Sequence, residues 1–270
     1  MRTLAPLGRR RVALVGADDV GAYRVLRAAD PTGPSPQAGQ FYMLAAAEGW
    51  GAGADERPYL PRAFSFLHAS GGALSFMLED VGPGTHRLAQ LTAGDELWLT
   101  GPLGAGFSAP HDDRRALLAG GGVGVPPLSA WARELTSDGA DVTAVLGFRD
   151  AHHAAGAALM ADGDVTVATD DGSVGHHGLV TELLAAELGT DDHAVVYACG
   201  PPAMLEAVRA LCAARGVPAQ LALEAGMACG FGACYGCVVA LAEGGYVRLC
   251  VDGPVLDADC LARVPQDAHA

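Results

Sequence analysis

Hydrophobic and polar positions follow one period in the first part of the chain and another in the second. Up to about residue 100, short apolar or alternating runs are separated by Gly, Pro and Asp, at residues 9–15, 22–28, 39–46, 72–80 and 95–100. Runs of this length with such separators predict β-strands joined by turns. We therefore expect residues 1–109 to fold as an antiparallel β-barrel.

A different pattern begins beyond residue 110. Apolar runs typical of buried strands start at residues 115, 141, 164 and 193, and helical spacing follows at residues 126–138, 178–189 and 201–216. Pro126 suits the first turn of the first helix, and Gly216 suits the end of the last. Strands that alternate with helices predict a parallel sheet covered on both faces, which we assign to residues 110–219.

Neither pattern continues into residues 220–270. This segment is rich in Cys and Gly and has no room for a large core of its own, which is typical of a small metal-stapled module. The sequence thus predicts a multidomain chain with α/β and all-β parts. These are an antiparallel β-barrel, a parallel-sheet domain and a small C-terminal module.

Composition and charge narrow the class of protein. Of the 270 residues, 50% are hydrophobic, and 17 basic against 31 acidic residues give a formal net charge of -14. Such a surface repels nucleic acid and anionic lipid, so we expect neither as a partner. The N-terminal residues lack the pattern of an export signal, and the longest uncharged run, residues 116–132, is interrupted by Gly and Pro. We therefore expect a soluble cytoplasmic protein.

Four of the seven cysteines have a spacing that suits a metal centre. Cys229, Cys234, Cys237 and Cys250 follow the pattern C-x4-C-x2-C-x12-C. The first three match the plant-type run that wraps a [2Fe–2S] cluster, and the glycines between them let backbone amides approach the sulfides. A zinc site is a weaker alternative, because zinc sites normally use two well-separated pairs of cysteines. A redox pair formed by Cys234 and Cys237 is weaker still, because it leaves the other two cysteines without a role.

Two motifs in the barrel region suit a flavin dinucleotide. Arg62 and Ser65, in RAFS, supply a cation for a pyrophosphate and a hydroxyl for a ring nitrogen. Gly82 and Gly84 free backbone amides for a second anion site, where Thr85 can cap the short helix that follows. A surface Arg beside an ordinary strand, and a plain turn, remain open as alternative interpretations.

Two turns in the α/β region suit a nicotinamide dinucleotide. The stretch AGGGVGVPPL, residues 119–128, follows a buried strand and opens a helix as a phosphate cradle does, although it lacks the G-x-G-x-x-G form. The stretch YACGPPAM, residues 197–204, ends a strand at the same edge of the sheet, where parallel sheets bind ligands. Cys199 in this stretch either borders the nicotinamide or is a buried core thiol.

Together these motifs resemble the ferredoxin reductase superfamily. Within it, LGFRD, ATDDGSVGHHGLVTELL, LEAGMACGFGACYGCVV and CVDGPV are similar to the electron-transfer subunits of dihydroorotate dehydrogenase B, and the similarity runs from about residue 11 to residue 256. It implies FAD, a [2Fe–2S] cluster and NAD(H) as cofactors. The barrel at 1–109 would bind FAD, residues 110–219 would bind NAD, and residues 220–270 would hold the cluster.

The resemblance also implies a role for each matching residue. Those for FAD are Arg62, Ala63, Phe64, Ser65, Gly82, Gly84 and Thr85. Those for the nicotinamide nucleotide are Gly120, Gly121, Gly122, Gly124, Cys199, Gly200 and Pro201. The four spaced cysteines match the cluster ligands, and Ser65 and Cys199 are the residues that we expect beside the reacting rings.

The implied function is electron transfer in pyrimidine biosynthesis. NADH would be oxidised through FAD, and electrons would pass singly through the cluster to an FMN-bearing dihydroorotate dehydrogenase catalytic subunit in a hetero-oligomer. The nearest alternative is a subunit of an NAD(P)H-ferredoxin oxidoreductase, sulfide dehydrogenase or hydrogenase, and a further one is a zinc-stapled nucleotide-binding module without redox role.

Three single positions bear on this interpretation. Ala105 stands where the family usually has Asn, and Gly226 stands where a polar or basic residue is common. Asp150, at the end of a predicted strand, favours NADH over NADPH if it accepts from a ribose hydroxyl, yet Asp at such a place is usually a turn former.

Overall fold

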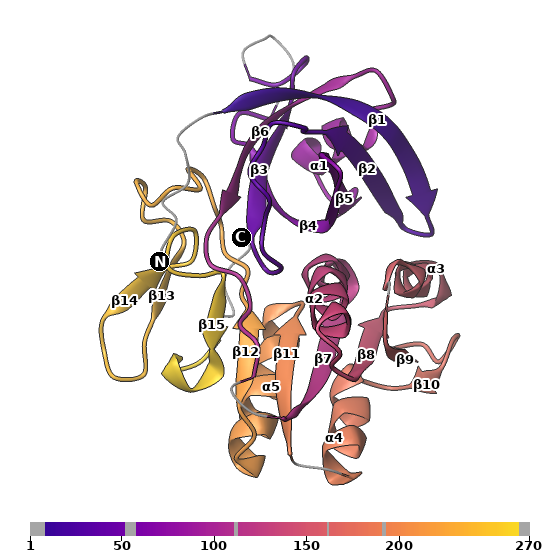
Figure 1. Ribbon diagram of the computed structural model, residues 1–270, viewed down its shortest axis with the longest axis vertical. Helices are drawn as coiled ribbons and strands as arrows, with labels where there is room; N and C mark the ends of the chain where they lie inside the picture. Colours follow the sequence, from indigo (N-terminus) through magenta and orange to yellow (C-terminus); the bar gives the residue numbers. More distant parts are fainter. Residues whose placement is uncertain (1–8, 52–57, 111–112, 161, 191–192, 265–270) are drawn as a thin grey trace.

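Three structural units follow one another along the chain (Figure 1). The computed structural model describes residues 9–51, 58–110, 113–160, 162–190 and 193–264. It shows a closed barrel, then a sheet with helices, then a small C-terminal part. The predicted combination of an antiparallel barrel, a parallel-sheet domain and a small C-terminal module is thereby confirmed. Among the described helices, none is long and apolar enough to span a membrane.

Six antiparallel strands close the barrel in the order β1-β2-β5-β4-β3-β6. The elements of the barrel are β1 (Arg10–Val20), β2 (Tyr23–Ala29), β3 (Phe41–Ala46), β4 (Arg62–Ser70), β5 (Ala73–Glu79), α1 (Pro83–Ala89) and β6 (Glu96–Leu103). Every residue of β3 is buried. Since side chains alternate between the two faces of a strand, both faces of β3 are therefore covered. Tyr42 and Leu44 point into the barrel core, whereas Phe41 and Met43 belong to a second core that includes the C-terminal part.

The hydrophobic pattern does not predict strand β4. Arg62, Ser65 and His68 interrupt its apolar positions, so that burial along it does not alternate. Antiparallel pairing with β3 and β5 nevertheless makes this segment a strand. The other barrel strands coincide with predicted runs, although β1 continues to Val20.

The α/β domain is built around a seven-stranded sheet in the order β10-β9-β8-β7-β11-β12-β15. Its elements are β7 (Arg115–Gly121), η1 (Gly122–Gly124), α2 (Val125–Ser137), β8 (Val142–Phe148), α3 (Ala151–Ala154), η2 (Ala155–Leu159), β9 (Asp164–Thr169), β10 (His176–His177), α4 (Val180–Thr190), β11 (Ala194–Cys199), α5 (Pro202–Arg215) and β12 (Ala219–Ala222). These strands pair in parallel, so their carboxyl ends meet at one edge.

Helices cover both faces of this sheet, as predicted. Helix α2 lies between the sheet and the barrel, and α4 and α5 lie on the opposite face (Figure 1). Leu128 of α2 belongs to the core that continues into the barrel. Leu184 of α4 and Val208 of α5 belong to the core that continues into the C-terminal part. Each face of the sheet therefore shares its core with a different neighbour.

Aromatic and ionic contacts join the barrel to the α/β domain. The ring centroids of Phe107 and Trp131 lie 5.8 Å apart, and that of Tyr197 lies 5.6 Å and 5.4 Å from them. Arg149, just after β8, pairs with Glu79 at the end of β5. These contacts hold the carboxyl edge of the sheet against the barrel, which is where a parallel sheet binds its ligands.

The C-terminal part is joined to the sheet rather than separate from it. Its elements are β13 (Val238–Ala240), β14 (Tyr246–Arg248), β15 (Val255–Asp257) and η3 (Ala258–Cys260). Strands β13 and β14 form a hairpin, and β15 pairs antiparallel with β12 at the edge of the seven-stranded sheet. The boundary predicted between residues 219 and 220 falls at the start of β12 and stays a prediction.

A buried ion pair ties β1 to the segment after β2. Arg10 donates to both carboxylate oxygens of Asp30, at 2.8 Å and 2.5 Å, and to the carbonyl of Gly101 at 2.7 Å. The Asp30 side chain is 3% exposed. We expect Arg10→Met to lower the free energy of unfolding by about 3–5 kcal/mol, because it leaves a buried carboxylate without its partner.

Urea denaturation followed by tryptophan fluorescence measures this loss. Arg11→Met is the matched control, because Arg11 pairs with Glu96 at the surface, with side chains 45% and 39% exposed. That variant should lose at most about 1 kcal/mol. Equal losses in the two variants would contradict the structural role given to Arg10.

Candidate functional site

A cleft of about 840 Å³ opens where the three units meet. Its wall is formed by β4 and the start of α1 in the barrel, by the end of β11, and by residues 222–228 before the cysteine loop. Volumes of roughly 300–1,000 Å³ are typical of small-molecule and cofactor sites. A molecule in this cleft would contact all three units.

The structure brings some of the predicted residues into this wall and leaves others behind it. The predicted residues that line the cleft are Arg62, Ala63, Phe64, Ser65, Thr85 and Cys199. The residues predicted for FAD and the nicotinamide nucleotide that lie outside its lining are Gly82, Gly84, Gly120, Gly121, Gly122, Gly124, Gly200 and Pro201, and the four predicted cluster cysteines lie outside it as well. The glycines therefore shape the turns behind the wall.

Strand β4 and helix α1 bring the predicted flavin residues together. The Thr85 hydroxyl accepts from the backbone N–H of Val81 at 2.9 Å and of Gly82 at 3.0 Å. The sequence suggested that Thr85 precedes and caps a short helix. Helix α1 instead begins at Pro83, so Thr85 lies inside its first turn and its hydroxyl bonds to the backbone before the helix. This hydroxyl fixes the turn that packs against Arg62.

Gly84 decides how closely this turn approaches Arg62. A Cβ on Gly84 would lie 2.5 Å from Arg62 Nε, closer than a side chain can come. Gly82, by contrast, has an extended backbone and open space around the same position. Of the two glycines, only Gly84 packs against the guanidinium, which a side chain at this position would displace.

The two predicted nucleotide turns lie against each other at the carboxyl edge of the sheet. A Cβ on Gly124 would lie 2.0 Å from the Cys199 carbonyl oxygen, and one on Gly121 would lie 2.8 Å from Met204 Sδ. A Cβ on Gly200 would likewise lie 3.0 Å from the Gly121 nitrogen. Glycine at these positions lets the start of α2 pack directly on the end of β11.

Cys199 is a core thiol that also faces the cleft. Its residue is 5% exposed, and it lines the wall together with Pro126 and Glu224. Burial raises the pKa of Cys199 well above its usual value, and the Glu224 carboxylate raises it further. The thiol therefore stays protonated and neutral near physiological pH.

Asp150 is engaged by the protein itself. Its Oδ1 accepts from the backbone N–H of His153 at 3.0 Å and contacts His153 Nδ1 at 2.8 Å, which caps helix α3. The hydrogen bond from the His153 side chain is the main cause that lowers the pKa of Asp150. This geometry agrees with the turn-former interpretation of Asp150.

Neither departure from the family pattern disturbs the local backbone. The Ala105 N–H donates to the carbonyl oxygen of Gly253 at 2.5 Å, so this position is bound to the C-terminal part through its backbone. Gly226 lines the cleft, and a side chain added there would meet open space.

The cysteine loop turns at glycines and lies on the outer wall of the barrel. Gly230 and Gly232 have φ values of 77° and 85°, where other residues are strained. A Cβ on Gly230 would lie 2.6 Å from Met43 Cγ, and one on Gly232 would lie 2.7 Å from Val251 Cγ2. The loop is thus enclosed between β3 and the segment that carries Cys250.

Arg248 holds the same loop from the hairpin side. Its Nη1 donates to the Gly232 carbonyl at 3.1 Å, and its guanidinium carbon lies 5.3 Å from the centroid of the Tyr235 ring. Tyr235 has a φ of 61°, an unusual value for a non-glycine residue. Sequence reasoning missed Arg248, and its place two residues before Cys250 is the signal that could have found it.

The predicted cluster ligands come together in two pairs. The Cys234 side chain contributes to the lowered pKa of Cys229, and the Cys237 side chain contributes to the raised pKa of Cys250, so the thiols are neighbours in these two pairs. Across the described residues, no three His, Cys, Asp or Glu side chains lie close enough together to hold a single metal ion. Two pairs of thiols are the donor set that a two-iron centre requires, so the residues present fit a [2Fe–2S] cluster.

Backbone amides and burial shift the pKa values of two of these thiols in opposite directions. Burial raises the pKa of Cys229, but hydrogen bonds from the backbone of Phe231 and Cys234 outweigh burial and lower that pKa to about 6. Burial raises the pKa of Cys250 to about 12, with the Cys237 thiol as the next cause. Amides that face the thiols favour their ionised, metal-binding form.

Residues 223–227 form the part of the cleft that the sequence did not assign. They connect β12 to the first cysteine, and all of them line the wall. Their place directly before the cysteine loop is the signal that could have found them. They make the cleft and the loop continuous.

The chain matches two family models. Residues 118–210 match the oxidoreductase NAD-binding domain, and residues 224–262 match the iron–sulfur cluster binding domain of dihydroorotate dehydrogenase B. The second match spans all four predicted ligands.

Solved structures share the fold. The NADH-dependent reduced ferredoxin-NADP oxidoreductase superposes with a TM-score of 0.78 at 24% identity, over 94% of this chain and 91% of that chain. Phthalate dioxygenase reductase superposes with a TM-score of 0.63 at 18% identity, over 90% and 94%. At these identities the likeness shows the fold alone.

Curated relatives are more similar. The chain is 43% identical over 234 residues to the dihydroorotate dehydrogenase B (NAD(+)) electron transfer subunit of Geobacillus kaustophilus (strain HTA426), covering 82% of this chain and 85% of that protein. It is 37% identical over 261 residues to the subunit of the same name from Geobacillus thermodenitrificans (strain NG80-2), covering 93% and 98%. Because identity at this level extends over most of both chains, the chain belongs to the family of dihydroorotate dehydrogenase B electron transfer subunits.

Proposed function

We propose that this chain takes electrons from NADH through FAD and passes them singly, through a [2Fe–2S] cluster, to the FMN-bearing catalytic subunit of a dihydroorotate dehydrogenase. One observation carries the proposal: a single cleft is lined by barrel residues, by Cys199 and by Ala228, the residue before Cys229. A flavin in this cleft adjoins the nucleotide edge of the sheet on one side and the cysteine loop on the other. The names of the relatives support the same role.

Arg62, Ser65 and Thr85 are the residues that we expect to hold FAD. When bound, FAD accepts a hydride and releases single electrons. The Arg62 guanidinium supplies a cation for the pyrophosphate, and its Nη1 is oriented by a 2.6 Å hydrogen bond to the Leu60 carbonyl. Ser65 presents a hydroxyl in the same wall, and Thr85 fixes the turn opposite.

The carboxyl edge of β7 and β11 is the expected site for NADH. Gly121, Gly124 and Gly200 keep the two turns in contact, so the nucleotide lies across their shared edge. The Cys199 thiol stays neutral because burial raises its pKa, which keeps a negative charge away from the nicotinamide. The cleft brings this edge to the barrel residues that we assign to FAD.

The two thiol pairs are expected to bind one iron each. The loop that carries Cys229, Cys234 and Cys237 directly follows Ala228 of the cleft wall, and Arg248 and Met43 restrain it from two sides. We also infer that the chain works in the cytoplasm, because a reducing compartment keeps such thiols free to bind metal.

Gly84→Ala tests the assignment of Arg62 to FAD. The added methyl must displace the Arg62 guanidinium, which lies 2.5 Å from its position. Loss of this charged contact should weaken FAD binding by about ten- to a hundredfold, measured by fluorescence titration of the deflavinated protein. Gly82→Ala is the control and should bind FAD as the wild type does, because its Cβ meets open space. Equal affinities in both variants would refute the assignment.

Cys234→Ser tests the cluster. Iron and acid-labile sulfide should be lost while FAD remains, and NADH-dependent reduction of the catalytic subunit should fall at least about tenfold, because even outer partners of a metal site are worth that much. Cys260→Ser is the control, since the Cys260 thiol bonds to the Asp257 carbonyl at 2.9 Å and matches no ligand. Full iron and sulfide in Cys234→Ser would show that the loop does not hold the cluster.

A further inference from the structure

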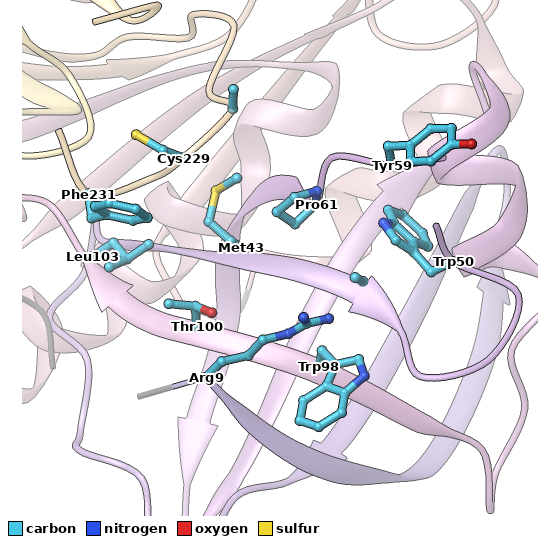
Figure 2. Close-up of a pocket in the computed structure, with 12 residues that line it drawn as sticks. Arg9, Met43, Trp50, Tyr59, Pro61, Trp98, Thr100, Leu103, Cys229 and Phe231 are labelled. Carbon is cyan, nitrogen blue, oxygen red and sulfur yellow. The ribbon is translucent and has the colours of Figure 1, made fainter. Parts of the chain in front are cut away.

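An outer cavity of about 320 Å³ lies on the wall of the barrel beside the cysteine loop, residues 229–237 (Figure 2). Its lining includes Met43, Tyr59, Trp98, Leu103, Cys229 and Phe231. Figure 2 shows Met43, Leu103 and Phe231 on the same side of the cavity as Cys229. These three side chains carry no hydrogen-bond donor, so donors to the thiols come from elsewhere.

Backbone amides of the loop supply such donors. The Gly236 N–H donates to the Cys234 sulfur at 3.5 Å. Burial raises the pKa of Cys229, but backbone hydrogen bonds outweigh burial, and Ala233 is one of the residues that provide them. A cluster gains one negative charge when it is reduced, so amides that donate to its thiolates raise its reduction potential.

Arg248 binds the peptide group that faces Cys229. Its Nη1 donates to the Gly232 carbonyl oxygen at 3.1 Å. This carbonyl and the Ala233 N–H belong to one peptide group, so a donor at the oxygen polarises the N–H. Because the guanidinium is charged, its hydrogen bond is stronger than that of a neutral donor. The bond from Ala233 to Cys229 is therefore strengthened by Arg248.

The same side chain restrains the peptide group that faces Cys234. The guanidinium carbon of Arg248 lies 5.3 Å from the centroid of the Tyr235 ring. Tyr235 has a φ of 61°, a left-handed conformation that is unfavourable for a non-glycine residue. Since Tyr235 and Gly236 share a peptide group, this conformation directs the Gly236 N–H at Cys234, and the stacked guanidinium helps to keep it.

Arg248 also brings positive charge to an acidic part of the chain. Residues 220–270 contain six acidic residues, two arginines and no lysine. Asp252 accepts from the Arg248 backbone N–H at 3.0 Å and lies 3.9 Å from its Nε. Asp252 therefore offsets part of the charge, which leaves the hydrogen bond to Gly232 as the main route by which Arg248 acts on the loop.

We propose that Arg248 raises the reduction potential of the cluster by holding two backbone amides against the sulfurs of Cys229 and Cys234. Arg248 is a positioning residue, since it acts through these peptide groups. The inference rests on the proposed function and adds the residue that makes the cluster an easier acceptor for single electrons.

The test is a redox titration of the purified holoprotein, followed by the electron paramagnetic resonance signal of the reduced cluster. Arg248→Met should lower the ratio of reduced to oxidised cluster at a fixed potential about tenfold, a shift of about 59 mV for one electron. Arg248→Lys should recover part of this shift, because it keeps a charged donor for the Gly232 carbonyl but loses the flat guanidinium. Iron, acid-labile sulfide and FAD contents should match the wild type in both variants.

Arg209→Met is the matched control. Arg209 pairs with Glu206 on α5, so this variant removes the same charge outside the cysteine loop and should leave the potential unchanged. An equal shift in Arg209→Met would assign the effect to net charge and overturn the inference.

A wild-type potential in Arg248→Met with full iron and sulfide would also overturn the inference, while the proposed function would stand. If Arg248→Met holds too little cluster to titrate, Arg248→Gln decides. It keeps a neutral donor for Gly232 and loses the charge, so its potential should fall, and an unchanged potential would count against Arg248. Wild-type protein that assembles no [2Fe–2S] cluster would end the proposed function as well.

Discussion

The packing of the cysteine loop against the outer wall of the barrel is the constraint on which the rest of the structure depends. Met43 points outward from β3, and Gly230 meets it with no room for a side chain. Strand β3 also contributes Tyr42 and Leu44 to the barrel core, so the position of the loop is tied to the fold of the barrel. The thiols are therefore held at one place relative to the cleft.

The cleft exists because the three units share their cores. The α2 face of the sheet continues into the barrel, and the α4 and α5 face continues into the C-terminal part. The cluster of Phe107, Trp131 and Tyr197 fixes the first of these contacts, and pairing of β15 with β12 fixes the second. Ala228, beside Cys229, lines both the cleft and the outer cavity, so the two hollows adjoin at one short segment.

Local sequence patterns were sufficient to predict much of the fold and the residues of each motif. The spacing of the cysteines, the alternation of strands with helices, and the glycines at the strand ends are properties of neighbouring residues, and they predicted the three units and the residues of each motif. The spacing also explains the thiol pairs, since Cys229 and Cys234 lie on one short loop. The same patterns did not predict β4, because this segment is a strand through its pairing with β3 and β5 and its own residues do not alternate between apolar and polar.

By itself, the sequence determined the kinds of unit in the fold and the cofactors, and it indicated which residues to assign to each cofactor, because spacing and residue type are local properties. Only the tertiary structure decided which of them face a common cleft, that Gly84 rather than Gly82 packs against Arg62, and that Tyr59, Trp98 and Phe231 surround a cavity next to Cys229. Those residues are distant along the chain and carry no shared motif. Their proximity follows from barrel closure and from packing of the C-terminal part on its wall, which no local pattern records.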